Sequence, residues 1–217
     1  MNAFKIMPRH LHNLGDIVLT TQVNYGSWTG RIPESKALAD AVIEVCSESE
    51  ITFAEAITAL AKFQSQFDQD VGLPRSMTMK QAAILNPLAR LAPPLDADFG
   101  GTFWEALYER VRSQDRPACP SRLLSSFACR ELSQLRNYCS VHKQNRMYDK
   151  LACEIVITGC DVAFDADTSI LDAIDGNMTY QTARPHILSY WDQSKTSSPI
   201  MEILLQGQYV LGKVVEL

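Results

Sequence analysis

Glu202 is the residue whose sequence surroundings most strongly suggest chemistry. It lies in an otherwise apolar run between a proline and a glycine, a pattern typical of a β-strand: Ser198-Pro199-Ile200-Met201-Glu202-Ile203-Leu204-Leu205-Gln206-Gly207. Alternation places Glu202 on one face of this strand with Ile200 and Leu204. Because burying an unpaired charge is costly, the carboxylate either faces solvent or lines a cleft. In a cleft it could bind a sugar hydroxyl or stabilise a cationic transition state.

Glu154 is a second glutamate in a strand-like run, which extends from Leu151 to Thr158. Glu154 and Glu202 could form the carboxylate pair of a glycosidase, in which one group protonates the leaving oxygen and the other assists at the sugar. The alternative is that Glu154 is a charge on an edge strand that faces solvent. The sequence leaves both readings open.

Arginine and serine side chains in two other places could bind an anion or a ribose. Ser121-Arg122 and Ser125-Ser126 would offer a guanidinium and hydroxyl groups on one extended segment. A guanidinium binds phosphate in a bidentate manner, and serine hydroxyls can orient a sugar. Arg9, followed by His10, could meet a phosphate or ribose after the first strand. Solvated surface positions are the alternative for each of these groups.

The familiar nucleotide-binding and nucleophile motifs do not occur in this sequence: it has no G-x-G-x-x-G, no P-loop and no G-x-S-x-G. Six cysteines are present, but they show no C-x-x-C spacing and no zinc-like pattern with histidine. No metal site is therefore predicted. The cysteines within or beside apolar runs are expected to be buried free thiols; these are Cys46, Cys129, Cys153 and Cys160.

The elements that position these residues are predicted to be strands near both ends of the chain with helices between them. Strands are predicted over residues 4–7, 17–21, 121–129, 151–158, 200–205 and 209–215, the last two joined as a hairpin by Gln206-Gly207-Gln208. Residues 162–175 are expected to leave the sheet and be exposed. Helices are predicted within residues 33–72, over 76–91, from 102 onward, over 130–139 and over 179–191, with a capping box at Thr52-Phe53-Ala54-Glu55. An apolar stripe on the helix that begins at this capping box is expected to face the core; it comprises Phe53, Ile57, Leu60, Phe63 and Phe67.

The composition fits a globular α+β protein. The chain has 217 residues, of which 46% are hydrophobic, enough for one large domain with a sizeable core. We expect a single domain over residues 1–217 that includes a helical segment over 33–94. The net charge of −5 gives no sign of a broad nucleic-acid surface. Because the chain shows no signal-peptide pattern and no apolar run of about 18 residues, a cytoplasmic protein without a membrane segment is predicted.

Three stretches together resemble bacterial proteins of the ADP-ribosyltransferase superfamily. They are Asp115-Arg116-Pro117 with Pro120-Ser121-Arg122-Leu123-Leu124-Ser125-Ser126-Phe127-Ala128-Cys129, then Tyr190-Trp191, then Pro199-Ile200-Met201-Glu202-Ile203-Leu204. The likeness covers roughly the last half of the chain and the opening strand and turn. It implies a split, mostly antiparallel sheet that holds NAD+ as a substrate in a cleft.

The resemblance also implies three site elements. The late-strand glutamate of the superfamily falls on Glu202, which would be catalytic. The middle-strand element falls on Ser125, Ser126 and Phe127, and the first-strand basic residue falls on Lys5 or Arg9. Arg122 would help to hold the diphosphate and Trp191 could pack on the nicotinamide.

The function implied is NAD+-dependent transfer of ADP-ribose to a protein or nucleic acid, by a toxin, effector or phage-defence enzyme that could have an antitoxin or immunity partner. Ile200 stands where paired-acid members of the superfamily carry glutamate or glutamine, which speaks against a protein arginine as acceptor. The same departure motivates an alternative, a catalytically inactive binding module of the same fold.

Overall fold

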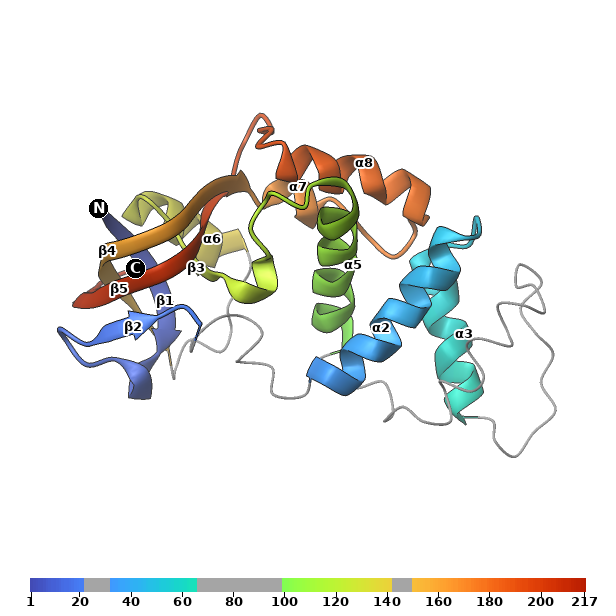
Figure 1. Ribbon diagram of the computed structural model, residues 1–217, viewed down its shortest axis with the longest axis horizontal. Coiled ribbons are helices and arrows are strands. Elements are labelled where there is room, and N and C mark those ends of the chain that lie inside the picture. The colour runs from blue at the N-terminus through green and yellow to red at the C-terminus, as the bar shows by residue number, and fades with distance from the viewer. Residues whose placement is uncertain (22–31, 66–98, 142–149) are drawn as a thin grey trace. The chain divides into compact units, whose positions relative to one another are not determined.

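The computed structural model describes residues 1–21, 32–65, 99–141 and 150–217. These residues form five strands and six α-helices, and the strand pairings among them are antiparallel. The predicted α+β class with a mostly antiparallel sheet is therefore confirmed. The chain divides into two compact units (Figure 1), the first comprising Met1–Thr29, Pro117–Leu171 and Ser189–Leu217, and the second comprising Gly30–Arg116 and Asp172–Leu188.

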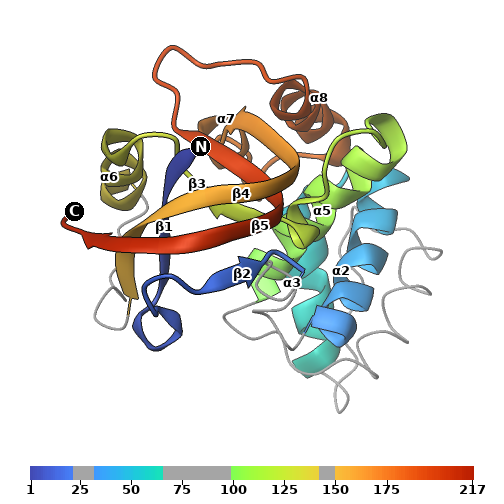
Figure 2. The same cartoon turned by 60° about the vertical axis from the view of Figure 1, so that its left-hand side comes forward.

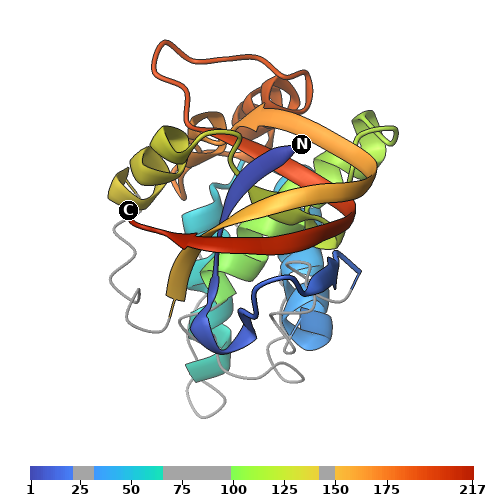
Figure 3. The ribbon, with the colours of Figure 1, turned by 90° about the vertical axis from the view of Figure 1, so that its left-hand side faces the viewer.

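Two long strands form the centre of the first unit: β4 (Lys150–Asp167) and β5 (Met201–Val215) pair along most of their length. β1 (Asn2–Pro8) pairs with β4, while β2 (Ile17–Leu19) and β3 (Ser126–Ala128) pair with β5. Figures 2 and 3 show β4 and β5 curving together, with β1 beside β4. Phe4 of β1 also pairs with Cys129, directly after β3, so β1, β4, β5 and β3 form a closed circuit of strands.

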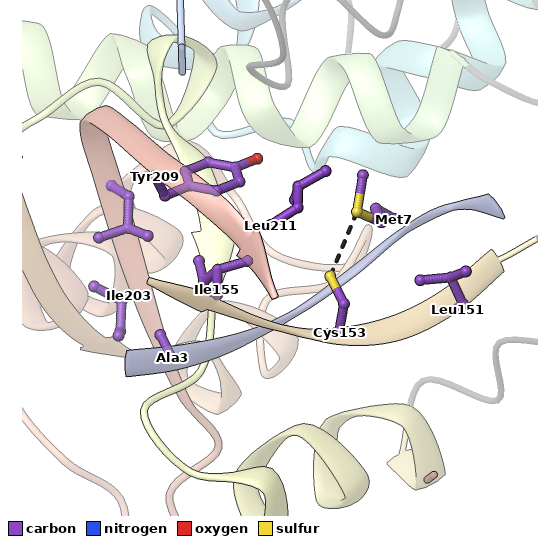
Figure 4. Close-up of a cluster of buried hydrophobic side chains, with 10 residues drawn as sticks. Ala3, Met7, Leu151, Cys153, Ile155, Ile203, Tyr209 and Leu211 are labelled. Atoms are coloured by element: carbon purple, nitrogen blue, oxygen red, sulfur yellow. Dashed lines mark hydrogen bonds between the residues drawn. The ribbon is translucent and has the colours of Figure 1, made fainter. Parts of the chain in front are cut away.

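The inside of this circuit is a hydrophobic core to which all four strands contribute (Figure 4). Alternate residues of each strand point the same way, so Ala3 and Met7 of β1 face this core while Phe4 and Ile6 face the other side. The other members of the core are Ala128, Leu151, Cys153, Ile155, Ile203, Leu205, Tyr209 and Leu211. On the other side, helix α6 (Leu132–Val141) packs through Leu132 and Leu135 against Phe4, Ile6 and neighbouring side chains.

The second unit is helical, with α2 (Ile32–Ser47), α3 (Phe53–Ser65), α5 (Phe99–Asp115) and most of α8 (Tyr180–Trp191). The capping box at the start of α3 is confirmed: Glu55 N donates to Thr52 Oγ1 at 3.2 Å and Thr52 N donates to Glu55 Oε2 at 2.8 Å. The core stripe begins as predicted with Phe53 and Leu60 fully buried. Phe67, the predicted helix over 76–91 and the end of the predicted helical segment over 33–94 lie outside the described residues.

The predicted hairpin over residues 200–215 is wrong, because these residues form one continuous strand, β5. Gly207 does not reverse the chain; its φ of 128° lets β5 stay paired where the register with β4 shifts around Gly159 and Cys160. A Cβ on Gly207 would lie 2.2 Å from the carbonyl oxygen of Gly159, so glycine is required by close backbone approach.

Three other predictions are corrected. Residues 162–167 do not leave the sheet but continue β4, and Asp167 at its end is buried. The predicted strand over 121–129 is extended only in β3, since Arg122–Leu124 form a short 3-10 helix, η2. Cys46, Cys129 and Cys153 are buried as predicted, but Cys160 is exposed beside the irregularity in β4, and all six cysteines are free thiols. Among the described helices, none has the length and apolar character needed to cross a membrane.

Candidate functional site

A pocket of about 200 Å³ in the first unit is lined by residues from segments that are far apart in the sequence. Lys5 comes from β1, Ser125, Ser126 and Phe127 come from the start of β3, and Glu202 comes from β5. These are the three places in the chain where sequence analysis predicted site elements. The remaining lining residues are Ile6, Met7, Pro8, Ala128, Cys129, Leu135, Tyr138 and Lys150.

Glu202 is the second residue of β5, and its carboxylate is buried with only 5% of the residue exposed. One oxygen, Oε1, accepts hydrogen bonds from the Tyr190 hydroxyl at 2.7 Å and from the guanidinium of Arg122. Within the described part of the chain, Oε2 accepts no hydrogen bond. The carboxylate is thus held through one oxygen, and the other is left for a ligand in the pocket.

Arg122 is buried on η2 and forms an ion pair with Glu202. Its Nη1 also donates to the Tyr190 hydroxyl at 2.6 Å. The guanidinium carbon lies 4.8 Å from the centre of the Phe127 ring and 5.3 Å from that of Tyr190, so both rings contribute cation–π attraction. Arg122 is not among the pocket-lining residues that the structure describes; its ion pair with Glu202 helps to orient the carboxylate.

Tyr190 is a site residue that sequence analysis did not select. It lies fully buried near the end of α8, where its hydroxyl accepts from Arg122 and donates to Glu202. Burial raises the pKa of this phenol well above its ordinary value, so it remains a neutral donor. The signal in the sequence was the Tyr190-Trp191 pair, but the residue type alone does not show which carboxylate the tyrosine hydroxyl will hydrogen-bond.

Lys5 lies in β1 between Ala3 and Met7, and its Nζ donates to the carbonyl oxygen of Phe127 at 2.9 Å. Although part of the residue remains accessible, burial of the ammonium group lowers its pKa to about 8. Of the two first-strand candidates, Lys5 lines the pocket. Arg9 is exposed on the 3-10 helix η1 (Arg9–Leu11) and is not among the lining residues.

The two serines before Phe127 are buried and hydrogen-bonded. Ser125 Oγ donates to the Ser121 carbonyl at 2.7 Å and accepts from Gln206 Nε2 at 3.2 Å. Ser126 Oγ lies 3.4 Å from the Tyr209 hydroxyl. These contacts connect the middle segment of the pocket to β5, and they hold the loop before β3 in place.

Asp167 positions the start of β5, and therefore Glu202. It is fully buried at the end of β4 and accepts hydrogen bonds from Ser169, from Thr196 N and Oγ1 (both 2.8 Å) and from Ile200 N (2.9 Å). Burial alone would raise the pKa of this carboxyl, but the hydrogen bonds outweigh it and hold the pKa below its ordinary value. Asp167 thereby anchors the exposed segment 192–199 at Thr196 and at Ile200, the residue directly after it.

Trp191 and Glu154 lie away from the pocket lining. Trp191 is buried, with its ring 4.8 Å from that of Tyr190 in an edge-to-face arrangement and 5.8 Å from that of Phe164, so it supports Tyr190. Glu154 accepts a hydrogen bond at 2.7 Å from the exposed side chain of Asn2. Because Glu154 does not line the pocket that holds Glu202, the geometry gives no support to a paired-carboxylate glycosidase.

The chain was compared with known proteins by family and by sequence. A search of curated protein sequences found no match. Residues 34–216, which include β3, β4, β5 and every pocket-lining residue outside β1, match the profile of a family described as "Protein of unknown function (DUF2441)". The match spans most of the chain, and the protein therefore belongs to the DUF2441 family.

Proposed function

We propose that this protein is an NAD+-dependent ADP-ribosyltransferase that modifies a protein or nucleic acid, with the split-sheet fold of that superfamily. The observation that carries the proposal is the convergence of three segments on one pocket. Lys5, the segment Ser125–Phe127 and Glu202 correspond to the three site elements that the sequence resemblance implies, and they line a single pocket although Lys5 and Glu202 lie near opposite ends of the sequence.

The residues of the pocket suit the nicotinamide end of NAD+. The pocket is smaller than the roughly 300–1,000 Å³ of a site that encloses a whole ligand of this kind. We therefore assign the nicotinamide and its ribose to the pocket and the adenosine end to the surface outside it. The Phe127 ring can pack on the nicotinamide, and the Lys5 ammonium can donate to an oxygen of the substrate.

In the proposed reaction, the bond between ribose C1′ and the nicotinamide nitrogen breaks, and its electron pair stays on the nicotinamide, which leaves as a neutral molecule. The ribose becomes an oxocarbenium-like cation. Oε2 of Glu202 accepts a hydrogen bond from a ribose hydroxyl and stabilises this charge, while Arg122 and Tyr190 hold Oε1. A nucleophile of the acceptor then adds at C1′ and loses its proton.

A second candidate is a catalytically inactive binding module of the same fold. The buried ion pair between Glu202 and Arg122 favours it, because this contact compensates the carboxylate's charge without any ligand. A module of this kind would bind NAD+ or a related nucleotide and release no nicotinamide. Binding and turnover therefore have to be measured on the same preparation.

The test uses NAD+ carrying a label on the adenosine, incubated with the protein and with separate protein and RNA or DNA fractions as acceptors. Wild-type protein should release nicotinamide and transfer the label to one class of acceptor. The variant Glu202→Gln keeps the size of the side chain and should lose about 10²–10³-fold in rate, the usual effect of removing one transition-state contact.

The matched control is Glu154→Gln, which changes the other strand glutamate outside the pocket and should keep wild-type activity. Equal activity of Glu202→Gln and wild type would contradict the proposal. Tight NAD+ binding by wild type with no nicotinamide release would instead favour the binding module.

A further inference from the structure

Lys5 has a position that is unusual for a lysine. It shares its face of β1 with Ala3 and Met7, both buried in the core of the first unit, because alternate residues of a strand point the same way. Its amine therefore reaches the pocket from the apolar side of β1 and ends at the Phe127 carbonyl. A lysine without a specific role is expected to extend its ammonium group into water.

The charged and titratable groups around Lys5 do not compensate the positive charge of its ammonium group. Its Nζ hydrogen bond is to a neutral carbonyl, and no ion pair with a carboxylate is formed within the described residues. Burial raises the pKa of Cys129 to about 12. It also raises the pKa of Cys153, which pairs with Lys5 between β1 and β4, to about 11, so both cysteines are neutral thiols. The other groups on the pocket wall are Glu202, which is paired with Arg122, together with Lys150 and Tyr138.

An amine in these surroundings is shifted toward its neutral form, because burial penalises the ammonium more than the free amine. The pKa of about 8 leaves roughly a tenth of Lys5 as free amine at pH 7, compared with less than a thousandth for an ordinary lysine with a pKa near 10.4. A free amine beside an accessible pocket is the arrangement that makes lysine a nucleophile toward carbonyl compounds.

We propose that Lys5 is a nucleophilic amine that captures small aldehydes in this pocket as imines. The inference does not depend on the proposed function, since it needs only the amine, the pocket and an aldehyde. The pocket is lined by the Phe127 ring, Met7, Pro8 and Ile6 as well as by polar groups, and its volume of about 200 Å³ suits a planar aldehyde of one ring.

The step balances without any further reactant. The Lys5 nitrogen adds its lone pair to the carbonyl carbon, and the former amine proton passes to the carbonyl oxygen to give a carbinolamine. The hydroxyl then leaves as water with one added proton, and the nitrogen keeps the double bond to carbon as a protonated imine. Glu202 lines the same pocket, and its carboxylate is a group that can exchange these protons.

The experiment traps the imine formed with salicylaldehyde by reduction with cyanoborohydride and locates the label by peptide mass spectrometry. In folded wild-type protein at pH 7, Lys5 should be labelled at least tenfold faster than Lys150, which lines the same pocket, or the exposed Lys195 and Lys213. Labelling of Lys5 should rise with pH and reach half its limit near pH 8.

Lys5→Arg and Lys213→Arg are the matched variants. Lys5→Arg should abolish the fast-labelled fraction, and Lys213→Arg, which changes an exposed lysine outside the pocket lining, should leave it unchanged, with folding of both checked by circular dichroism. Labelling of Lys5 in wild type no faster than that of the exposed lysines would overturn the inference, and this result does not depend on whether Lys5→Arg folds. Because no NAD+ is present, failure here leaves the nicotinamide-release test untouched, and failure of that test leaves this one untouched.

Discussion

At the scale of single residues, the first unit depends on how one buried charge is compensated. Glu202 would be costly to bury alone, but it is held by Arg122 and by the neutral hydroxyl of Tyr190. Arg122 in turn lies close to the rings of Phe127 and Tyr190. The three groups therefore act as a unit, and the effect of changing one of them should depend on the others.

Arg122→Met tests this coupling. Removing one partner of a buried ion pair leaves an uncompensated charge and typically costs about 3–5 kcal/mol of unfolding free energy. The double variant Arg122→Met/Glu202→Gln removes both charges and should be destabilised by less than the sum of the two single variants. Urea unfolding of the four proteins measures the interaction energy, which we expect at about 1–3 kcal/mol. Strictly additive effects would show that the two side chains are not coupled.

At the scale of elements, the position of Glu202 is set by the contacts of Asp167 before β5 and by Gly207 within β5. Asp167 at the end of β4 accepts hydrogen bonds from the backbone N–H of Ile200 and from the backbone N–H and hydroxyl of Thr196. Gly207 then lets β5 continue through the irregular pairing with β4 instead of turning back. Asp167 and Gly207 each give a prediction about the stability of the protein rather than about its activity.

Asp167→Asn should destabilise the protein by about 2–3 kcal/mol at pH 7, because a buried acceptor of several hydrogen bonds is replaced by a group that cannot accept them all. The folded-state pKa of Asp167 lies below its unfolded value, so the stabilisation is fully present above about pH 4 and is lost as the pH falls further. The stability difference from wild type should therefore shrink in acid. Asp165→Asn, which alters a half-exposed pair with Arg130, is the control and should cost less than about 1 kcal/mol.

Gly207→Ala should destabilise by more than about 2 kcal/mol, because the new Cβ would both require an unfavourable φ and collide with the Gly159 carbonyl. Gly15→Ala is the matched control: Gly15 also has a positive φ, of 90°, but a Cβ there meets no atom within 4 Å. Thermal unfolding should show a clearly larger loss for Gly207→Ala. Equal losses would mean that backbone strain alone, without the close approach, explains the glycine.

At the scale of the whole molecule, the chain forms two compact units, each with its own aromatic cluster. Phe53 packs on Phe103 and Trp104 in the second unit, with ring centres 5.5 and 5.6 Å apart, while Phe164 packs on Tyr190 and Trp191 in the first. Separate cores allow parts of a protein to open with different free energies.

Phe53→Ala should lower the stability of the second unit by about 3–5 kcal/mol. Hydrogen exchange read by mass spectrometry should then show lost protection in α2, α3 and α5 while peptides of β4 and β5 keep theirs. Phe164→Ala is the counterpart and should give the opposite pattern. A uniform loss of protection in both variants would show that the two units unfold as one.

The sequence predicted the elements whose signal is local, and it failed where the decisive contact is distant. The Thr52–Glu55 capping box, the buried face of α3 and the strand character around Glu202 are readable from neighbouring residues. The role of Gly207 depends on the backbone of Gly159, and the η2 turn depends on packing around Arg122. The hydrogen bond between Tyr190 and Glu202 could not be predicted, because the residues next to either of them in the sequence do not indicate this contact.

The most direct test of the proposed function is a crystal structure of the protein with NAD+. We predict that the nicotinamide lies in the pocket beside Phe127 and that a hydroxyl of its ribose donates to Oε2 of Glu202 at about 2.7 Å, with Oε1 still bound by Tyr190 and Arg122. NAD+ bound elsewhere on the protein, or a ribose directed away from Glu202, would contradict it.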